Sequence, residues 1–113
     1  MTKNKILGMN FHSIKKDDLI SLIKKEILSN HKNKYISITN TEALYFGNKN
    51  LDHFNYINNA FLSLCDGIGV KIGALSKNKK IIRYNGPKLF NDIINHGQKY
   101  NWKHYFLGGT EEV

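Results

Sequence analysis

One carboxylate, Asp66, lies in the stretch LCDGIGVKIGA (residues 64–74), whose other side chains are apolar, absent or, at one position, a lysine. Gly67 and Gly69 follow it, and glycines allow positive φ and a close approach of a ligand to the backbone. Apolar neighbours leave a carboxylate poorly hydrated, which makes it a better proton acceptor. The pattern therefore makes Asp66 a candidate general base. Capping of a helix that begins near Gly69 is an equally open interpretation.

The glycines at 67, 69 and 73 resemble the G-x-G-x-x-G fingerprint of dinucleotide-binding proteins, but the last interval is one residue too long. The region about 20 residues further on is basic and offers no acid for a ribose hydroxyl. The five histidines show no metal-ligand spacing, and a single cysteine cannot build a zinc cluster. We therefore expect neither a dinucleotide cofactor nor a metal.

Other residues could bind an anion or a sugar. Arg83 is the only arginine among 17 basic residues, and a guanidinium can grip a phosphate or carboxylate through two hydrogen bonds, which lysine cannot. Asn40 could hydrogen-bond a sugar hydroxyl or simply cap a helix. Gly108 and Gly109 precede a predicted helix start, so their backbone N–H groups could face an anion. A chance surface arginine and plain helix capping remain open alternatives.

The composition predicts one globular domain over residues 1–113, because 41% of the chain is hydrophobic and 12% is aromatic. Its net charge of +8 is concentrated in residues 67–104, where eight basic side chains face one acid, Asp92. Such a charge favours nucleic acid, phosphorylated small molecules or acidic lipid headgroups, although a solvated lysine surface would look the same. The lone Cys65 excludes an intrachain disulfide and fits a reducing compartment.

The hydrophobic pattern predicts the elements that would position these residues. Strands are expected at 6–11, 35–39, 62–65 and 104–109. Helices are expected at 16–30, 41–47, 51–61, 70–80 and 87–100, with a further one starting at Thr110. Strands that alternate with helices predict an α/β, Rossmann-like fold with a largely parallel sheet and flanking helices. Ligands bind beyond the carboxyl ends of such strands, so TNTE, CDGIG and LGGTEE should share one rim.

The last predicted strand is followed by only the first turn of a helix, so the crossover helix that normally covers a parallel sheet would be missing. We therefore expect the sheet to be truncated and the chain to be the N-terminal portion of a longer protein.

The stretches ITNTEALYFG, CDGIGVKIGA, RYNGPKLF and HYFLGGTEEV, in this order and spacing, resemble the WecG/TagA/CpsF family of bacterial glycosyltransferases. The likeness covers nearly the whole chain. The combination of N-x-E, D-G-x-G and R-x-x-G is fairly specific, although each motif alone is common. Family members are typically longer than this chain, which agrees with the expected truncation.

The resemblance implies an inverting transfer of an N-acetylmannosamine-type sugar from a UDP-sugar donor to a polyprenyl-diphosphate-linked acceptor. The product would feed cell-surface polysaccharide or teichoic acid biosynthesis, without a cofactor. The resemblance also implies an enzyme of the cytoplasm, peripheral at the inner face of the cell membrane.

The same resemblance implies residue roles. Asp66 matches the general base, Arg83 a pocket arginine that could steady diphosphate charge, and Asn40 a pocket asparagine. The expected substrate-binding set is completed by Thr39, Gly67, Gly69, Gly86, Gly108 and Gly109. Two positions depart from the family pattern: Ile38 replaces a common threonine and Lys88 a common aspartate.

Lys77, Lys79 and Lys80 could hold such an enzyme near an anionic membrane surface. Two alternatives remain open, a non-catalytic basic domain that binds nucleic acid and an inactive truncated fragment of the enzyme. Against the first, aromatic residues do not alternate with the lysines as in an RNA-binding motif, and we expect no nucleic-acid partner. The sequence does not predict the oligomeric state.

Overall fold

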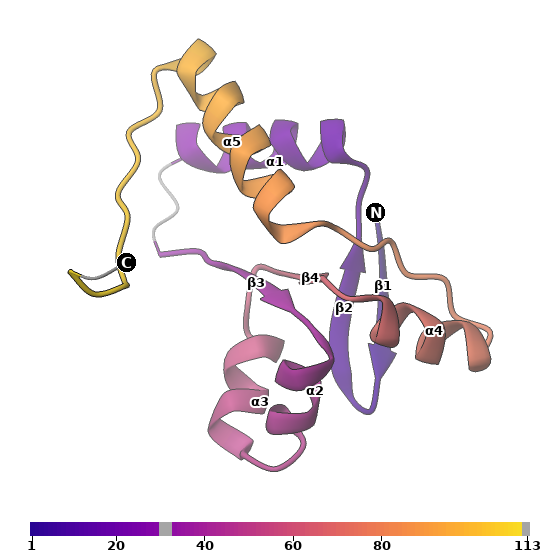
Figure 1. The fold of residues 1–113 in the computed structure, drawn as a ribbon. Helices are drawn as coiled ribbons and strands as arrows, with labels where there is room; N and C mark the ends of the chain where they lie inside the picture. The colour runs from indigo at the N-terminus through magenta and orange to yellow at the C-terminus, as the bar shows by residue number, and fades with distance from the viewer. Residues whose placement is uncertain (30–32, 112–113) are drawn as a thin grey trace.

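A four-stranded sheet lies between two groups of helices in the computed structural model, which describes residues 1–29 and 33–111 (Figure 1). In chain order the elements are β1 (Thr2–Ile6), β2 (Met9–Ser13), α1 (Lys16–Leu28), β3 (Ile36–Thr39), α2 (Thr41–Gly47), α3 (Leu51–Asn58), β4 (Leu62–Cys65), α4 (Ile68–Ser76) and α5 (Gly86–Tyr100). The strand order is β1-β2-β4-β3. β2, β4 and β3 run parallel, and β1 is an antiparallel edge strand. The predicted α/β fold with a largely parallel sheet is confirmed.

The N-terminus differs from its prediction of one strand over 6–11. It forms a hairpin of β1 and β2, in which Ile6 is paired with Met9. The two turn residues, Leu7 and Gly8, have positive φ values of 50° and 80°. Two-residue hairpin turns with positive φ at both positions usually contain Asn-Gly or Asp-Gly. Because Leu7 stands where Asn or Asp is usual, the sequence did not indicate this turn.

Each face of the sheet has its own hydrophobic core. On one face the core joins β2 and the end of β4 to α2, α3 and α4, through Ile6, Met9, Phe11, Leu44, Ile57, Cys65, Val70, Ala74 and Ile81. On the other face it joins β4 to α1 and α5, through Ile14, Leu19, Leu62, Leu64, Tyr84 and Leu89. All of β4 is buried, because successive side chains of this central strand enter opposite cores.

Asparagines define where three of the helices begin. Asn40, Asn50 and Asn85 are the N-caps of α2, α3 and α5, and each side chain accepts a hydrogen bond from the backbone N–H three residues later. Such caps satisfy N–H groups that have no partner within the helix. The caps at Asn40 and Asn85 start α2 and α5 beside the ends of β3 and β4.

The prediction of a strand over 104–109 is wrong. These residues are extended but pair with no strand in the described part of the chain, and the yellow segment in Figure 1 turns back at the end of α5 and runs apart from the sheet. Tyr105 and Leu107 are 87% and 90% exposed. Aromatic and apolar content predicted a strand, but a strand also needs a partner edge. The helix predicted from Thr110 continues into residues outside the described part.

Candidate functional site

Asp66 occupies the carboxyl edge of the sheet, directly after β4. Its backbone N–H donates to the Thr39 carbonyl at 3.0 Å, and the N–H of Tyr84 donates to the Cys65 carbonyl at 2.8 Å. The loop is thus held from both sides, by the end of β3 and by the chain before α5. The ends of β3 and β4 share one rim, as predicted.

The side chain of Asp66 points at the first residue of α5. A Cβ at Gly86 would lie 2.7 Å from the Asp66 Oδ2 atom, so only glycine allows this approach. The carboxylate therefore lies at the N-terminus of a 15-residue helix, whose dipole stabilises negative charge. The N-cap of α4 is Gly67, so Asp66 does not take the capping position that the sequence left open.

The two glycines after Asp66 bring the loop against the start of α2. Gly67 has φ of 134°, and a Cβ there would lie 3.7 Å from Asn40 Cβ. A Cβ at Gly69 would lie 2.7 Å from Thr41 Oγ1, which makes Thr41 a rim residue that the sequence did not single out. Asn40 Oδ1 accepts from the Ala43 N–H at 2.8 Å. Asn40 therefore caps α2, and its exposed amide NH₂ still carries two donors.

Thr39 lies beneath the rim. Its side chain is fully buried, and its hydroxyl is 3.0 Å from the hydroxyl oxygens of both Ser37 and Ser63. This chain of hydroxyls ties β3 to β4 within the sheet. The Thr39 carbonyl therefore helps to hold Asp66 in place, whereas the Thr39 side chain points into the sheet and away from the rim.

Arg83 lies beside the end of β4, where it forms a parallel bridge with Cys65. Its neighbours fix this segment to the end of β2. Tyr84 Oη accepts from the Ile14 N–H at 2.8 Å and donates to the Ile14 carbonyl, and the Ile82 N–H donates to Ser13 Oγ at 3.0 Å. No sequence pattern singled out Tyr84 or Ser13, because their roles depend on contacts across about 70 residues of chain.

The electrostatics of Cys65 show which charges gather at this rim. Burial raises the pKa of the Cys65 thiol, and the negative charge of Asp66 raises it further. The positive charges of Arg83 and Lys71 act in the opposite direction. The charges of Asp66, Arg83 and Lys71 thus all act on one buried thiol, whose raised pKa keeps it protonated and unreactive.

Gly108 and Gly109 are not brought to this rim. Both are exposed, with φ values of 123° and 77°, and no described heavy atom lies within 4 Å of a Cβ at Gly108. The segment touches α5 through Phe106, whose ring centroid is 5.7 Å from that of Phe90. The third predicted loop therefore lies apart from the other two in this structure.

Two grooves are lined by residues that neighbour the Asp66 loop in the chain or in the sheet. An apolar groove of about 570 Å³ is lined by Gly86, Pro87 and Phe90 of α5 and by Ile38 of the open β3 edge, among others. A second groove, of about 610 Å³, is lined by the Arg83 segment and by α4. Asp66 itself lines neither groove. Its carboxylate faces Gly86, which lines the first, and Arg83, which is paired with the neighbouring Cys65, lines the second.

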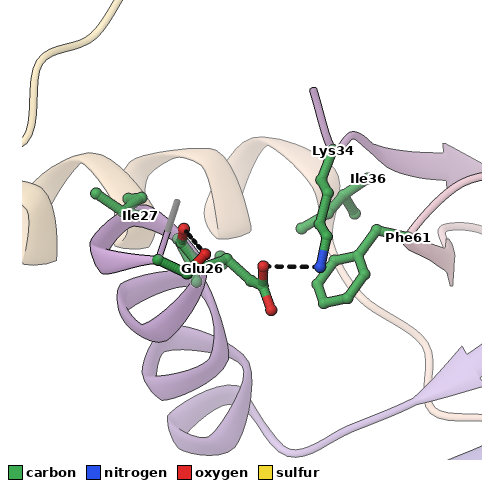
Figure 2. Close-up of a pocket in the computed structure, with 7 residues that line it drawn as sticks. Glu26, Ile27, Lys34, Ile36 and Phe61 are labelled. Carbon is green, nitrogen blue, oxygen red and sulfur yellow. Dashed lines mark hydrogen bonds and ion pairs between the residues drawn. The ribbon is translucent and has the colours of Figure 1, made fainter. Parts of the chain in front are cut away.

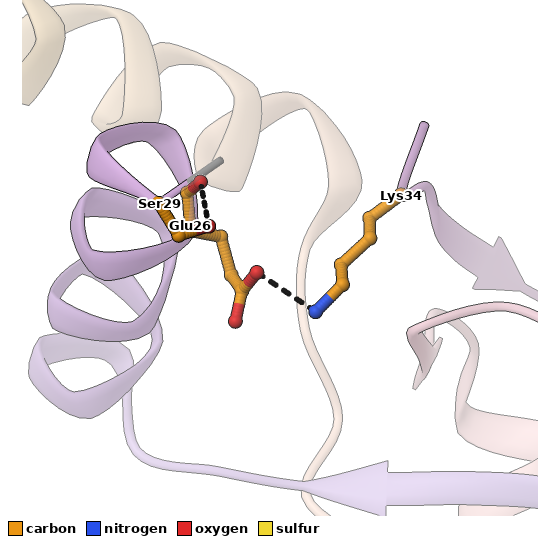
Figure 3. A network of polar contacts seen from close by, with 3 residues as sticks. All are labelled: Glu26, Ser29 and Lys34. Carbon is orange, nitrogen blue, oxygen red and sulfur yellow. Dashed lines mark hydrogen bonds and ion pairs between the residues drawn. The ribbon is translucent and has the colours of Figure 1, made fainter. Parts of the chain in front are cut away.

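A further cavity, of about 310 Å³, lies between the end of α1 and the start of β3, away from Asp66 (Figure 2). Its charged groups pair with each other, since Lys34 Nζ is 2.8 Å from Glu26 Oε2 and 4.4 Å from the centre of the Phe61 ring. Figure 3 shows the same pair together with Ser29, whose hydroxyl donates to the Glu26 carbonyl at 2.8 Å. None of the predicted site residues lines this cavity.

Comparison with known proteins supplies the identity of the chain. A search of curated proteins finds no match. Comparison with protein families matches residues 4–113 to the glycosyl transferase WecG/TagA/CpsF family. The match includes the rim built by Asp66, Asn40, Gly86 and Arg83. The chain therefore belongs to the WecG/TagA/CpsF family of glycosyltransferases.

Proposed function

We propose that this glycosyltransferase carries out an inverting transfer in which Asp66 is the general base. The observation that carries the proposal is the position of this carboxylate, which is partly buried at the carboxyl edge of the sheet and faces Gly86, a residue that lines the apolar groove. A general base must reach the proton that it removes, and an edge carboxylate beside a groove meets that condition.

The proposed transfer needs only one base to account for every proton and bond. The hydroxyl oxygen of the acceptor attacks the anomeric carbon of the donor sugar, and Asp66 takes the hydroxyl proton. The bond between the anomeric carbon and the diphosphate oxygen breaks, and its electron pair leaves with the nucleoside diphosphate. Attack from the face opposite the leaving group inverts the configuration.

The leaving diphosphate needs positive charge, and Arg83 and Lys71 are its proposed source. Two observations support this choice: Arg83 and Lys71 line the same groove, and their charges act on the same thiol as that of Asp66. A guanidinium can form two parallel hydrogen bonds to a phosphate, which stabilises charge that develops as the bond breaks. The Asn40 amide and the backbone at Gly67, Gly69 and Gly86 would contact the sugar.

The substrates proposed are a UDP-activated sugar of the N-acetylmannosamine type and a polyprenyl-diphosphate-linked acceptor, for cell-surface polysaccharide or teichoic acid. We place the enzyme in the cytoplasm at the inner membrane face, near anionic lipid. No helix among the described residues is long and apolar enough to cross a bilayer. Gly108 and Gly109 would join the site only if their segment approached the rim.

Asp66→Asn tests the proposal, because the amide keeps the shape of the carboxylate and cannot take a proton. With UDP-N-acetylmannosamine and a polyprenyl-diphosphate-linked acceptor, transfer should fall by about 10²- to 10⁴-fold. Asp52→Asn, at an exposed acid in the first turn of α3, is the matched control and should leave the rate unchanged. Transfer by Asp66→Asn at the parental rate would refute the assignment of the base.

Arg83→Lys separates charge from geometry. It keeps the positive charge but loses the paired donors, so transfer should fall while retention on an anionic column stays the same. If Arg83→Lys transfers sugar as fast as the parent, the diphosphate is held elsewhere.

A further inference from the structure

Helix α4 is apolar on two opposite sides. Val70 and Ala74 are buried in the core, whereas Ile68, Ile72 and Leu75 are 61%, 58% and 52% exposed. At 100° per residue the exposed three form one stripe, directly opposite the buried pair. We name these three residues the α4 face. A helix that is apolar all round is normally covered on every side.

The surroundings of the α4 face are basic. Lys71 lies on the helix beside it, Lys77 is the C-cap, and Lys80 follows in the next loop. Lys71, Leu75 and Lys80 line the groove that also contains Arg83, so the apolar stripe and the cationic groove are continuous.

Acids are scarce around this surface. Asp18 is the one acid among the described residues that line the groove. Asp92, the only acid in residues 67–104, pairs with Lys16 at 3.0 Å on the other side of the sheet. A second copy of this chain would bring lysines against lysines, which disfavours a symmetric dimer through this face. An anionic bilayer instead offers apolar depth and negative headgroups together.

We propose that the α4 face is a membrane-docking surface, which enters the headgroup region of an anionic bilayer while the surrounding lysines contact the lipid phosphates. Ile68, at the start of α4, is two residues from Asp66, so docking sets the rim at the membrane surface. This inference rests on the proposed function in one respect: a lipid-linked acceptor is what makes that placement useful.

Flotation of the full chain with vesicles tests the proposal. The chain should float with vesicles of phosphatidylcholine and phosphatidylglycerol, but not with phosphatidylcholine alone, and salt should weaken the binding. The double substitution Ile72→Gln with Leu75→Gln should weaken it by at least about tenfold, because glutamine keeps the helix and removes the apolar stripe. Lys77→Gln with Lys80→Gln should weaken it by about tenfold or more, since each lysine near an anionic surface contributes about 1 kcal/mol.

Matched controls distinguish the face from general surface chemistry. Leu28→Gln with Leu51→Gln removes two apolar side chains that are 75% and 72% exposed on other helices, and should leave flotation unchanged. Equal binding by the α4-face variant and the parent would overturn the proposal, as would equal binding to neutral and anionic vesicles. So would a dimer in light scattering that the α4-face variant dissociates.

The vesicle test needs no turnover, so its failure and the failure of the proposed function are separate results. Transfer to a short-chain, detergent-dispersed acceptor should be the same for the parent and for Ile72→Gln alone, because Ile72 does not line the groove that contains Arg83. Loss of flotation with that transfer retained supports docking at this face. Transfer abolished in the parent itself would refute the enzyme assignment and leave the docking result standing.

Discussion

Gly67 and Gly108 have nearly the same backbone angle, with φ of 134° and 123°. Gly67 lies just beyond the strand predicted over 62–65, and Gly108 lies near the end of the strand predicted over 104–109. Around Gly67 the chain is held by hydrogen bonds from β3 and from the segment before α5, and it packs against the start of α2. Around Gly108 no described heavy atom comes within contact distance of a Cβ position.

The difference teaches that glycine in a turn does not by itself make a site. At the rim, Gly69 and Gly86 are required because another group occupies the space of the missing side chain, Thr41 Oγ1 in one case and Asp66 Oδ2 in the other. In the 104–109 segment Gly108 allows an unusual backbone conformation, but no described atom packs against it. Pre-organisation comes from such neighbours, and a catalytic carboxylate depends on it.

Among the substitutions that test this comparison, the largest expected effect is on transfer, in Gly86→Ala. Because a Cβ there would lie 2.7 Å from Asp66 Oδ2, the carboxylate must move, and a misplacement of about 1 Å can cost about 100-fold in rate. Gly73→Ala is the control, since no described atom lies within 4 Å of its Cβ position, and its rate should match that of the parent. Equal rates for the two variants would show that the contact between Asp66 and Gly86 does not matter for transfer.

Tyr84→Phe tests how the Arg83 segment is held. It removes both hydrogen bonds to the backbone of Ile14 and leaves a buried N–H and carbonyl without that partner. The free energy of unfolding, measured with urea, should fall by about 1–3 kcal/mol. Tyr105→Phe, at a tyrosine in the 104–109 segment that is 87% exposed, should change it very little. A similar loss in both variants would contradict the comparison.

Gly67→Ala and Gly108→Ala compare the two turns directly. Alanine is strained at either φ, but only the loop at Gly67 is prevented from relaxing by its neighbours. The first substitution should lower the free energy of unfolding by about 1–3 kcal/mol, and the second by less than about 0.5 kcal/mol. Thermal or urea unfolding measures both, and equal values would show that the strain is local in each case.

A smaller effect is expected from pH, through His12 in β2. Burial lowers the pKa of His12 below its usual 6.5, and its Nδ1 accepts a hydrogen bond from the Ser63 N–H at 3.0 Å. As the pH falls below 6.5, the unfolded chain takes up the proton first, so stability declines from that point until the folded pKa is passed.

Unfolding curves across this pH range measure the decline, whose slope cannot exceed about 1.4 kcal/mol per pH unit for one group. His12→Asn keeps an acceptor for Ser63 and has no titrating ring, so it should flatten the profile. An unchanged profile in His12→Asn would assign the decline to another group.

Local signals were sufficient for several parts of the fold and the site. Asn40 followed by helical spacing predicted the start of α2, and Pro87 after Gly86 predicted the start of α5. The buried run before Asp66 predicted β4 and its place at the rim. Each of these features depends on residues close together in the chain, so propensity and capping can reveal it.

Other parts depend on residues far apart in the chain. Tyr84 matters because it reaches the backbone of Ile14, and Thr41 because α4 crosses beside it at Gly69. The Leu7-Gly8 hairpin formed against the turn preference of leucine, because β1 pairs with β2 along its whole length. No window of sequence contains such contacts.

The sequence by itself determined the alternation of strands and helices, the lone acid after a buried strand, and the excess of lysine over residues 67–104. Only the tertiary structure decided which glycines are crowded, which end of the chain lies away from the rim, and which helix exposes an apolar face. The reason is physical: periodicity and capping act within a few residues, whereas close approach and exposure depend on what packs nearby.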